Sequence, residues 1–210
     1  NGDGWRKIWG AWRTLSNPRA VASPNPFKCI GAVRYDKPAV IIMGYRFWNH
    51  YDLSTSLKPS VTGTAGLIFS WRGPKNFLKA VVTAPDSGGS KVILSQVRDG
   101  RETVLGSAPI LDAVGRWISL QVTNREGVAI RVSIDGVAVV DGPSGLDGHG
   151  KVGYIVSRDI GTFDDFMLKA GRDLPPIISP YVRSLAYGNT PRKPQDNRDG
   201  EVRWARDTDA

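Results

Sequence analysis

Three short alternating segments between residues 117 and 168 constrain the fold of this chain more than any other feature. Apolar residues take every second position in 117–122 and in 128–134, which is the period of a strand with one buried face. The turn signals Asn124-Arg125-Glu126-Gly127 and Asp135-Gly136 separate these segments, and Asp-Gly is a strong hairpin signal. The last segment closes with Phe163-Asp164-Asp165-Phe166. Successive antiparallel strands predict an all-β sandwich or barrel, an architecture that does not by itself define a function.

Further strand signals occupy most of the preceding sequence. They are rich in β-branched or aromatic residues and are bounded by Pro, Gly, Asn or Asp. The segments are 30–35, 39–51, 53–58, 65–71, 77–83, 91–98 and 101–107. We therefore expect about ten to twelve strands within residues 30–170 and hardly any long helix.

The opening segment contains Trp5, Trp9 and Trp12. Together with Ile8, their spacing would also suit one face of a helix. Three glycines within the first ten residues weaken a helix, so edge strands and turns are the preferred interpretation.

Two regions differ in composition, and they divide the 210 residues into a domain, 1–170, and an arm, 171–210. All-β sandwiches often reach about 200 residues as a single unit. The arm holds five of the fourteen prolines and shows neither strand nor helix periodicity, which predicts an extended segment. Apolar residues in the arm predict a docking surface, either on a protein partner or on the edge of the domain's own core. They are Ile177, Ile178, Tyr181, Tyr187 and Trp204.

Positive charge is concentrated in the first half of the chain. The net charge is +8, and residues 1–85 carry twelve Lys and Arg against three Asp and Glu. Such a surface can attract nucleic acid, anionic lipid or acidic polysaccharide, or simply keep the protein soluble. Nucleic acid is the least favoured partner, because the arginines are scattered through strands and no base-reading motif is present.

The single cysteine, Cys29, excludes an internal disulfide and a thiolate metal cluster. Its apolar neighbours favour an inert thiol over a nucleophile. No apolar run approaches the roughly 18 residues of a membrane-spanning helix, so we expect no transmembrane segment. Because the chain starts at Asn1 rather than Met, a removed leader is one interpretation, and we expect an extracytoplasmic location, periplasmic or secreted.

Four motifs occur in an order that resembles the laminin G-like branch of the concanavalin A-like lectin/glucanase superfamily. They are Gly115-Arg116-Trp117, the strand ending in Asp135-Gly136, Gly150-Lys151-Val152-Gly153, and Phe163-Asp164-Asp165-Phe166. The resemblance covers about residues 1–170 and implies a jelly roll of two packed antiparallel sheets, one of them concave. In many members the curved face or the rim loops hold sugars.

Hydrolases of this superfamily carry paired carboxylates on one strand, in a pattern such as Glu-x-Asp-x-Glu. The glutamates of this chain, Glu102, Glu126 and Glu201, are never paired. Asp164 and Asp165 are adjacent, so strand alternation predicts that they point to opposite faces. Hydrolysis through a nearby acid and nucleophile is therefore not expected.

Candidate ligand residues lie in two places. If 39–51 is one strand, then Arg46, Trp48 and His50 share a face, although that face can equally be core and His50 an ordinary hydrogen-bonded histidine. Trp71 and Arg72 end a strand where a loop begins, and with Lys79 they suit an aromatic face and cations that bind an acidic sugar, although Trp71 also suits a packing role.

Metal and cofactor signals are weak. The string Gly148-His149-Gly150-Lys151-Val152-Gly153 matches a dinucleotide motif, but it precedes a strand in an all-β region, so we reject that interpretation. No cofactor is expected, except for a structural calcium ion held by Asp3 with Asp164 or Asp165. The alternative is that these aspartates bond turn amides.

These observations predict a non-catalytic, lectin-like recognition or scaffold module that binds an anionic glycan or docks on a larger protein assembly through its arm. The alternative is a polysaccharide lyase or glycoside hydrolase with an unconventional site around Arg46, His50 and Lys79.

Overall fold

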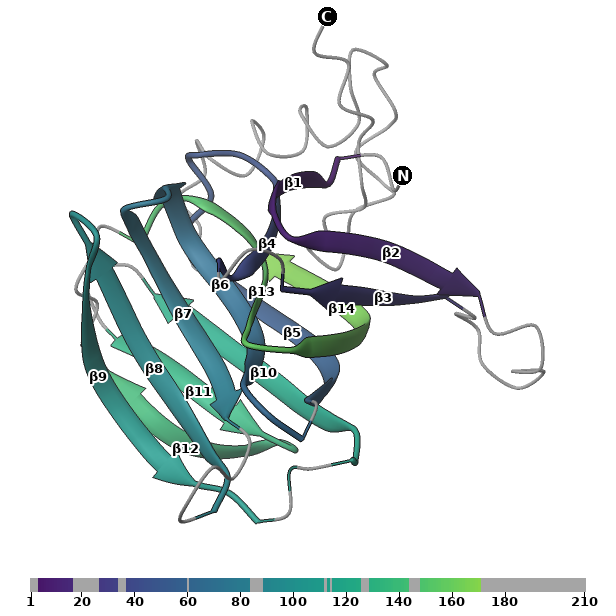
Figure 1. The fold of residues 1–210 in the computed structure, drawn as a ribbon. Coiled ribbons are helices and arrows are strands. Elements are labelled where there is room, and N and C mark those ends of the chain that lie inside the picture. Colours follow the sequence, from purple (N-terminus) through teal and green to yellow (C-terminus); the bar gives the residue numbers. More distant parts are fainter. Residues whose placement is uncertain are drawn as a thin grey trace, which may run out of the picture.

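Two antiparallel sheets packed face to face form the body of the protein (Figure 1). The computed structural model describes residues 4–16, 27–33, 37–59, 61–83, 89–111, 113, 115–125, 129–143 and 148–170. All regular elements within these ranges are strands, which confirms the predicted all-β sandwich. None of them is a helix long and apolar enough to cross a membrane.

Each sheet has seven strands. The first sheet, sheet A, has the order β1 (Arg6–Trp9), β4 (Ala39–Met43), β13 (Lys151–Ser157), β6 (Thr64–Gly73), β7 (Asn76–Thr83), β8 (Lys91–Arg98) and β9 (Arg101–Pro109). The second, sheet B, has the order β12 (Val137–Gly142), β11 (Ala129–Ile134), β10 (Ile118–Arg125), β5 (Tyr51–Pro59), β14 (Ile160–Ala170), β3 (Phe27–Ala32) and β2 (Ala11–Ser16).

The core lies between the sheets and follows the alternation visible in the sequence. In β5, Leu53 and Leu57 are fully buried, while the intervening Ser54 and Ser56 are only partly covered. Tyr154 of sheet A stacks on Phe163 of sheet B with ring centroids 4.1 Å apart. Aromatic stacking of this kind adds to the burial of apolar area that holds the layers together.

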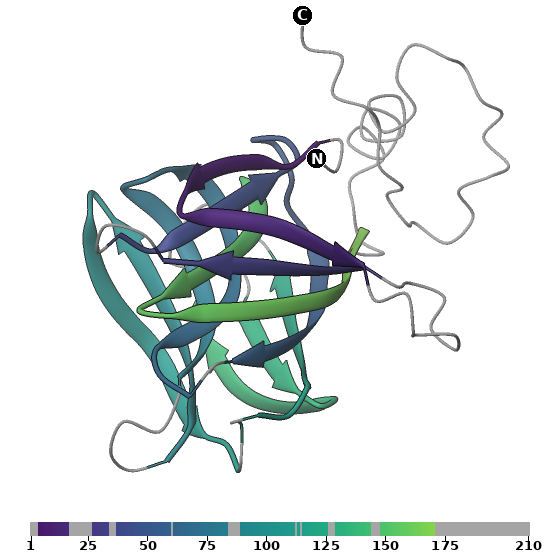
Figure 2. The ribbon, with the colours of Figure 1, turned by 45° about the vertical axis from the view of Figure 1, so that its right-hand side comes forward.

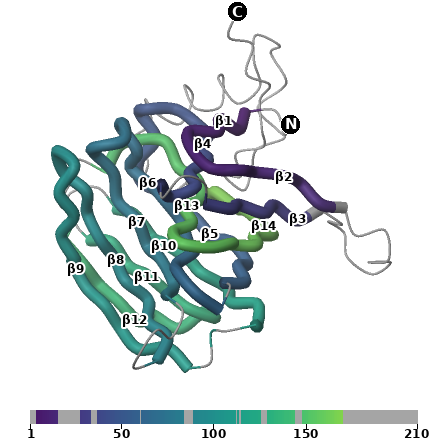
Figure 3. The backbone as a smooth tube through the Cα atoms, in the orientation of Figure 1, coloured from purple at the N-terminus to yellow at the C-terminus, as the bar shows by residue number. Residues whose placement is uncertain are grey.

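The opening segment forms two edge strands, so the helix alternative is wrong. Strand β1 lies at the edge of sheet A and β2 at the edge of sheet B, and the chain turns between them at Gly10 (Figure 3). Gly10 has φ +78°, and a Cβ there would overlap Ala39. This corner requires glycine, because no other residue would fit both the backbone angle and the space.

Sheet A is apolar on its outer face as well. In β7, Leu78 packs into the main core, whereas Phe77 and Val81 belong to a second cluster, here called the outer cluster. Its other buried members are Val40, Ile42, Ile68, Trp71, Val97 and Ile155. Because both faces of β4 are covered, its sequence is a continuous apolar run rather than an alternation.

The predicted strand 39–51 is too long. Strand β4 ends at Met43, Gly44 takes φ +84°, and the next strand begins only at Tyr51. The segment 44–50, here called the β4–β5 loop, contains turns and no ladder pairing. Its aromatic residues imitate the composition of a strand, but the glycine ends the extended run.

Candidate functional site

Strand β14 contains a β-bulge, and beyond this bulge it no longer pairs with β3. Strand β14 pairs with β5 along most of its length, but with β3 only from Ile160 to Phe163. The register with β5 shifts between Asp164 and Met167, and Asp165 takes φ +50°. A bulge bends the strand that carries it, and here the second half of β14 no longer pairs with β3. Figure 2 shows β2, β3 and β14 lying side by side at this end of sheet B.

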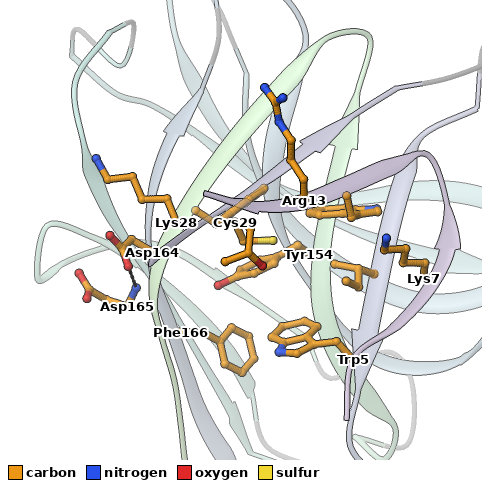
Figure 4. A pocket seen from close by; sticks show the side chains of 13 residues that line it. Trp5, Lys7, Arg13, Lys28, Cys29, Tyr154, Asp164, Asp165 and Phe166 are labelled. Atoms are coloured by element: carbon orange, nitrogen blue, oxygen red, sulfur yellow. Dashed lines mark hydrogen bonds between the residues drawn. The ribbon is translucent and has the colours of Figure 1, made fainter. Parts of the chain in front are cut away.

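A cavity of about 370 Å³ lies where the two strands separate, and we call it the bulge pocket (Figure 4). Its apolar wall consists of Trp5, Trp12, Ile41, Tyr154, Phe163 and Phe166. Its polar residues are Lys7, Arg13, Thr14, Lys28, Asp164 and Asp165, and Cys29 completes the lining. Both sheets therefore contribute to one opening.

The rings of the wall support one another. Trp5 stacks on Tyr154 at 5.2 Å with planes 13° apart, and Phe166 meets Trp5 edge to face at 5.0 Å. The hydroxyl of Thr55 donates to the backbone oxygen of Asp164 at 2.7 Å, and the Tyr154 hydroxyl lies 3.2 Å from the Thr55 oxygen. Burial raises the pKa of Tyr154 far above its usual value, so the phenol stays protonated and donates. The wall is thus fixed in place without a ligand.

Two carboxylates line the same pocket. The Asp165 amide donates to Asp164 Oδ1 at 2.9 Å, and the Ser56 hydroxyl donates to Asp165 Oδ2 at 3.0 Å. Burial raises the pKa of Asp164, and the charge of Asp165 adds to this. The expectation that these residues point to opposite faces is wrong, because the left-handed residue at the bulge interrupts the alternation of the strand.

Three cations come from three different strands. Lys7 lies on β1, Arg13 on β2 and Lys28 on β3. Lys28 Nζ also lies 5.0 Å from the ring centroid of Trp117, and its charge lowers the pKa of Asp164. In Figure 4, Lys7 and the two aspartates lie on opposite sides of Tyr154 and Cys29. The pocket therefore has a positive and a negative side.

Cys29 forms part of the floor between these sides. Burial raises the pKa of its thiol to about 11, against a smaller opposing effect of Lys7. A thiol with this pKa is almost entirely protonated at neutral pH, and only the thiolate is a good nucleophile. Cys29 thus has the inert character that its apolar neighbours predict.

Arg46, Trp48 and His50 do not share a strand face as predicted. Trp48 is 6% exposed and belongs to the core, Arg46 is exposed, and His50 is half-buried with φ +49°. The three residues lie on the β4–β5 loop instead of sharing one strand face, because β4 ends at Met43.

The other predicted ligand residues lie in two environments. Trp71 is 5% exposed in the outer cluster, and the exposed Arg72 beside it donates from Nε to the backbone oxygen of His149 at 3.4 Å. Asn49 on the β4–β5 loop contacts the His149 ring at 3.1 Å, so the fold brings this loop near Arg72. Lys79 lies elsewhere, in an ion pair of 2.8 Å with Glu102.

The predicted calcium ligands are only partly placed. Asp3 lies outside the described residues, as do Ile177, Ile178, Tyr181, Tyr187 and Trp204 of the arm. Within the described ranges, no three His, Cys, Asp or Glu side chains come together as a metal-ligand set. Calcium takes about six to eight oxygen ligands, which Asp164 and Asp165 alone do not supply. Asp164 accepts from the backbone amide of Asp165 at the bulge.

Sequence reasoning noted Trp5 and Phe166 but assigned neither to a site, and it missed Lys7, Arg13, Lys28 and Tyr154 as members of one. A signal for the bulge was present in the doubled aspartate, because two adjacent polar residues break the alternation of a strand. No pattern along the chain indicates that four separate strands would meet beside it.

Comparison with solved structures identifies the architecture. The carbohydrate-binding module CBM66 from Bacillus subtilis matches with a TM-score of 0.64 and 17% identity, over 80% of this chain and 96% of that chain. A structure described as a native glycosidic hydrolase matches with a TM-score of 0.51 and 13% identity, over 79% and 88% of the two chains. A mutant of the GH43 protein BlXynB from Bacillus licheniformis matches with a TM-score of 0.51 and 17% identity.

The match to BlXynB covers 76% of this chain but only 36% of that protein. At these identities the similarities show a shared fold, a sandwich of two antiparallel sheets, and nothing of the ligand. No family model matches the chain, and no curated protein matches it. Assignment to the laminin G-like branch stays a prediction.

Proposed function

We propose that the domain is a non-catalytic carbohydrate-recognition module whose binding site is the bulge pocket. One observation carries this proposal: a fixed aromatic wall, which includes the partly exposed Trp5 and Phe166, stands beside carboxylates and cations in one cavity. The C–H face of a sugar ring packs on an aromatic face, while its hydroxyls donate to carboxylates and accept from ammonium groups.

The physical properties of the cavity support a small ligand. A volume of about 370 Å³ falls in the range of roughly 300 to 1,000 Å³ typical of ligand sites. Trp5 and Tyr154 are already stacked, so binding need not order them, and a preorganised wall lowers the entropic cost of association. The fold shared with a carbohydrate-binding module is a further support, by analogy only.

The arrangement of carboxylates favours recognition over hydrolysis. Glycosidases place an acid and a nucleophile or base on either side of the scissile bond, about 5 to 9.5 Å apart. Asp164 and Asp165 lie together on one side of the bulge pocket, and Lys7 occupies the other (Figure 4). The alternative enzymatic site around Arg46, His50 and Lys79 has less support, because β13 and β6 lie between β4 and the strand of Lys79.

Affinity electrophoresis in neutral and acidic polysaccharides tests the proposal. We expect at least one polysaccharide to retard the protein, and Trp5→Ala to weaken that binding at least tenfold, about 1.4 kcal/mol. Trp9→Ala is the matched control, since Trp9 is also half-buried beside β4 but lies in the outer cluster. Thermal melts of both variants measure any loss of folded protein. Equal binding by both variants, or no retardation in any polysaccharide, would refute the proposal.

Docking on a protein assembly concerns residues 171–210, which lie outside the described ranges. It remains a prediction, together with an extracytoplasmic location. Deleting 171–210 and following co-purification with a larger complex tests it: a folded domain that still co-purifies would contradict docking through the arm.

A further inference from the structure

The distribution of charge in the bulge pocket distinguishes among sugars. Figure 4 shows Lys7 on one side of Cys29 and Tyr154, and Asp164 with Asp165 on the other. A ligand that spans the floor therefore meets an ammonium group at one end and carboxylates at the other.

The negative side already has partners for much of its charge. Asp165 accepts from the Ser56 hydroxyl and Asp164 from a backbone amide, and Lys28 lies close enough to act on Asp164 electrostatically. A second full cation placed there would meet Lys28 as a like charge, which is unfavourable. Neutral donors, such as two hydroxyls of a sugar ring, suit these carboxylates better.

The positive side lacks such compensation among the residues that the structure describes. Within the described ranges, no carboxylate lies within ion-pair distance of Lys7 or Arg13. Lys7 acts electrostatically on the Cys29 thiol, which is neutral at physiological pH. A cation that has no counter-ion among the described residues favours an anionic ligand group, and a charge-assisted hydrogen bond is stronger than a neutral one.

We infer that the bulge pocket selects a uronic acid unit, whose carboxylate meets Lys7 while its ring hydroxyls meet Asp164 and Asp165. The inference rests on the proposed function and names the class of sugar. Arg13 lies on the neighbouring edge strand and adds to the positive potential at the mouth of the pocket. The ring itself packs on the wall formed by Trp5 and Phe166.

The test compares short oligomers of galacturonate, glucuronate and mannuronate with the methyl ester of each, by calorimetry at low salt. Esterification removes the charge and keeps the ring, so the wild type should bind at least one acid about tenfold or more tightly than its ester. Lys7→Met should reduce that preference to about twofold or less and leave ester binding nearly unchanged. Lys91→Met, which removes an exposed lysine of β8 outside the pocket, should keep the preference.

The outcomes separate this inference from the proposed function. Equal binding of acid and ester, binding of neutral glycans alone, or an equal loss for acid and ester in Lys7→Met would overturn the uronate assignment while leaving a sugar site in the pocket. An unchanged affinity in Trp5→Ala, or no binding of any glycan, would overturn both. Raising the salt concentration should weaken acid binding more than ester binding, because screening acts on the charged pair.

Discussion

Two aromatic clusters lie beside β1, and only one of them borders a cavity. Trp9 packs edge to face on Trp71 at 6.3 Å, and Trp71 stacks on Phe77 at 5.1 Å, so the outer cluster is filled by its own side chains. Trp5, four residues earlier, stacks on Tyr154 but opens onto a cavity with charged walls. A concentration of tryptophan therefore does not by itself indicate a site. The cluster around Trp5 differs from the outer cluster because the pairing of β14 with β3 stops beside it.

The largest effect is expected from truncating a buried ring of the apolar wall of the bulge pocket. Phe163 is fully buried against Tyr154, and Phe163→Ala should lower the free energy of unfolding by about 3 to 5 kcal/mol. Denaturant titration measures this loss. A cost below about 1 kcal/mol would mean that the two sheets do not depend on this contact.

The next effect separates the two clusters. Trp71→Ala should cost about 3 kcal/mol in stability, since Trp71 is 5% exposed, yet leave the affinity of the folded protein for glycan unchanged. Denaturant titration and calorimetry below the unfolding range report the two quantities separately. If Trp71→Ala abolished binding and Trp5→Ala did not, the functional roles of the clusters would be reversed.

A smaller effect concerns the bulge that separates the strands. Asp165 holds φ +50°, a conformation that Asp tolerates and a β-branched residue does not. Asp165→Val should therefore cost about 1 to 2 kcal/mol, whereas Asp165→Asn keeps the backbone preference and should cost less. Thermal unfolding of the pair checks the difference. Equal stability of the two variants would show that the bulge does not depend on this residue type.

The smallest effect is a pH dependence. The pKa of Asp164 is raised in the folded protein, so its contribution to stability is fully present below the unfolded pKa of about 3.9 and is lost as pH rises through the folded value. Because Asp164 is only partly buried, the change in stability should be slight. An NMR titration of its carboxyl measures the shift, and Lys28→Met should raise it further. An Asp164 pKa unaffected by that substitution would contradict the placement of Lys28 beside it.

The sequence predicted most of the strands but not which residues line the bulge pocket, and the difference has a physical origin. Alternation in 117–122 and 128–134 indicates which face of each strand is buried, so β10 and β11 could be predicted from their own segments. β4 ended early because a glycine outweighed the aromatic residues of 44–50. The pairing of β14 with β3 stops beside the left-handed backbone of Asp165, and the two adjacent aspartates are the only local signal of this change.

The charged residues of the bulge pocket illustrate the same limit. Lys7, Lys28 and Asp164 are separated by many positions in the chain and meet only because β1, β3 and β14 converge. Such long-range convergence has no local signature, whereas the fully buried Leu53 and Leu120 could be expected from their own segments.

If the bulge pocket is the binding site, ligand binds beside Trp5 and not in the outer cluster. Titrating ¹⁵N-labelled protein with a uronate oligomer that binds in calorimetry, while following the indole N–H signals, tests it most directly. We expect saturable shifts for the indole of Trp5 and for the amides of Asp165 and Phe166, and no shifts for Trp9 and Trp71. Shifts confined to Trp9 and Trp71 would contradict it.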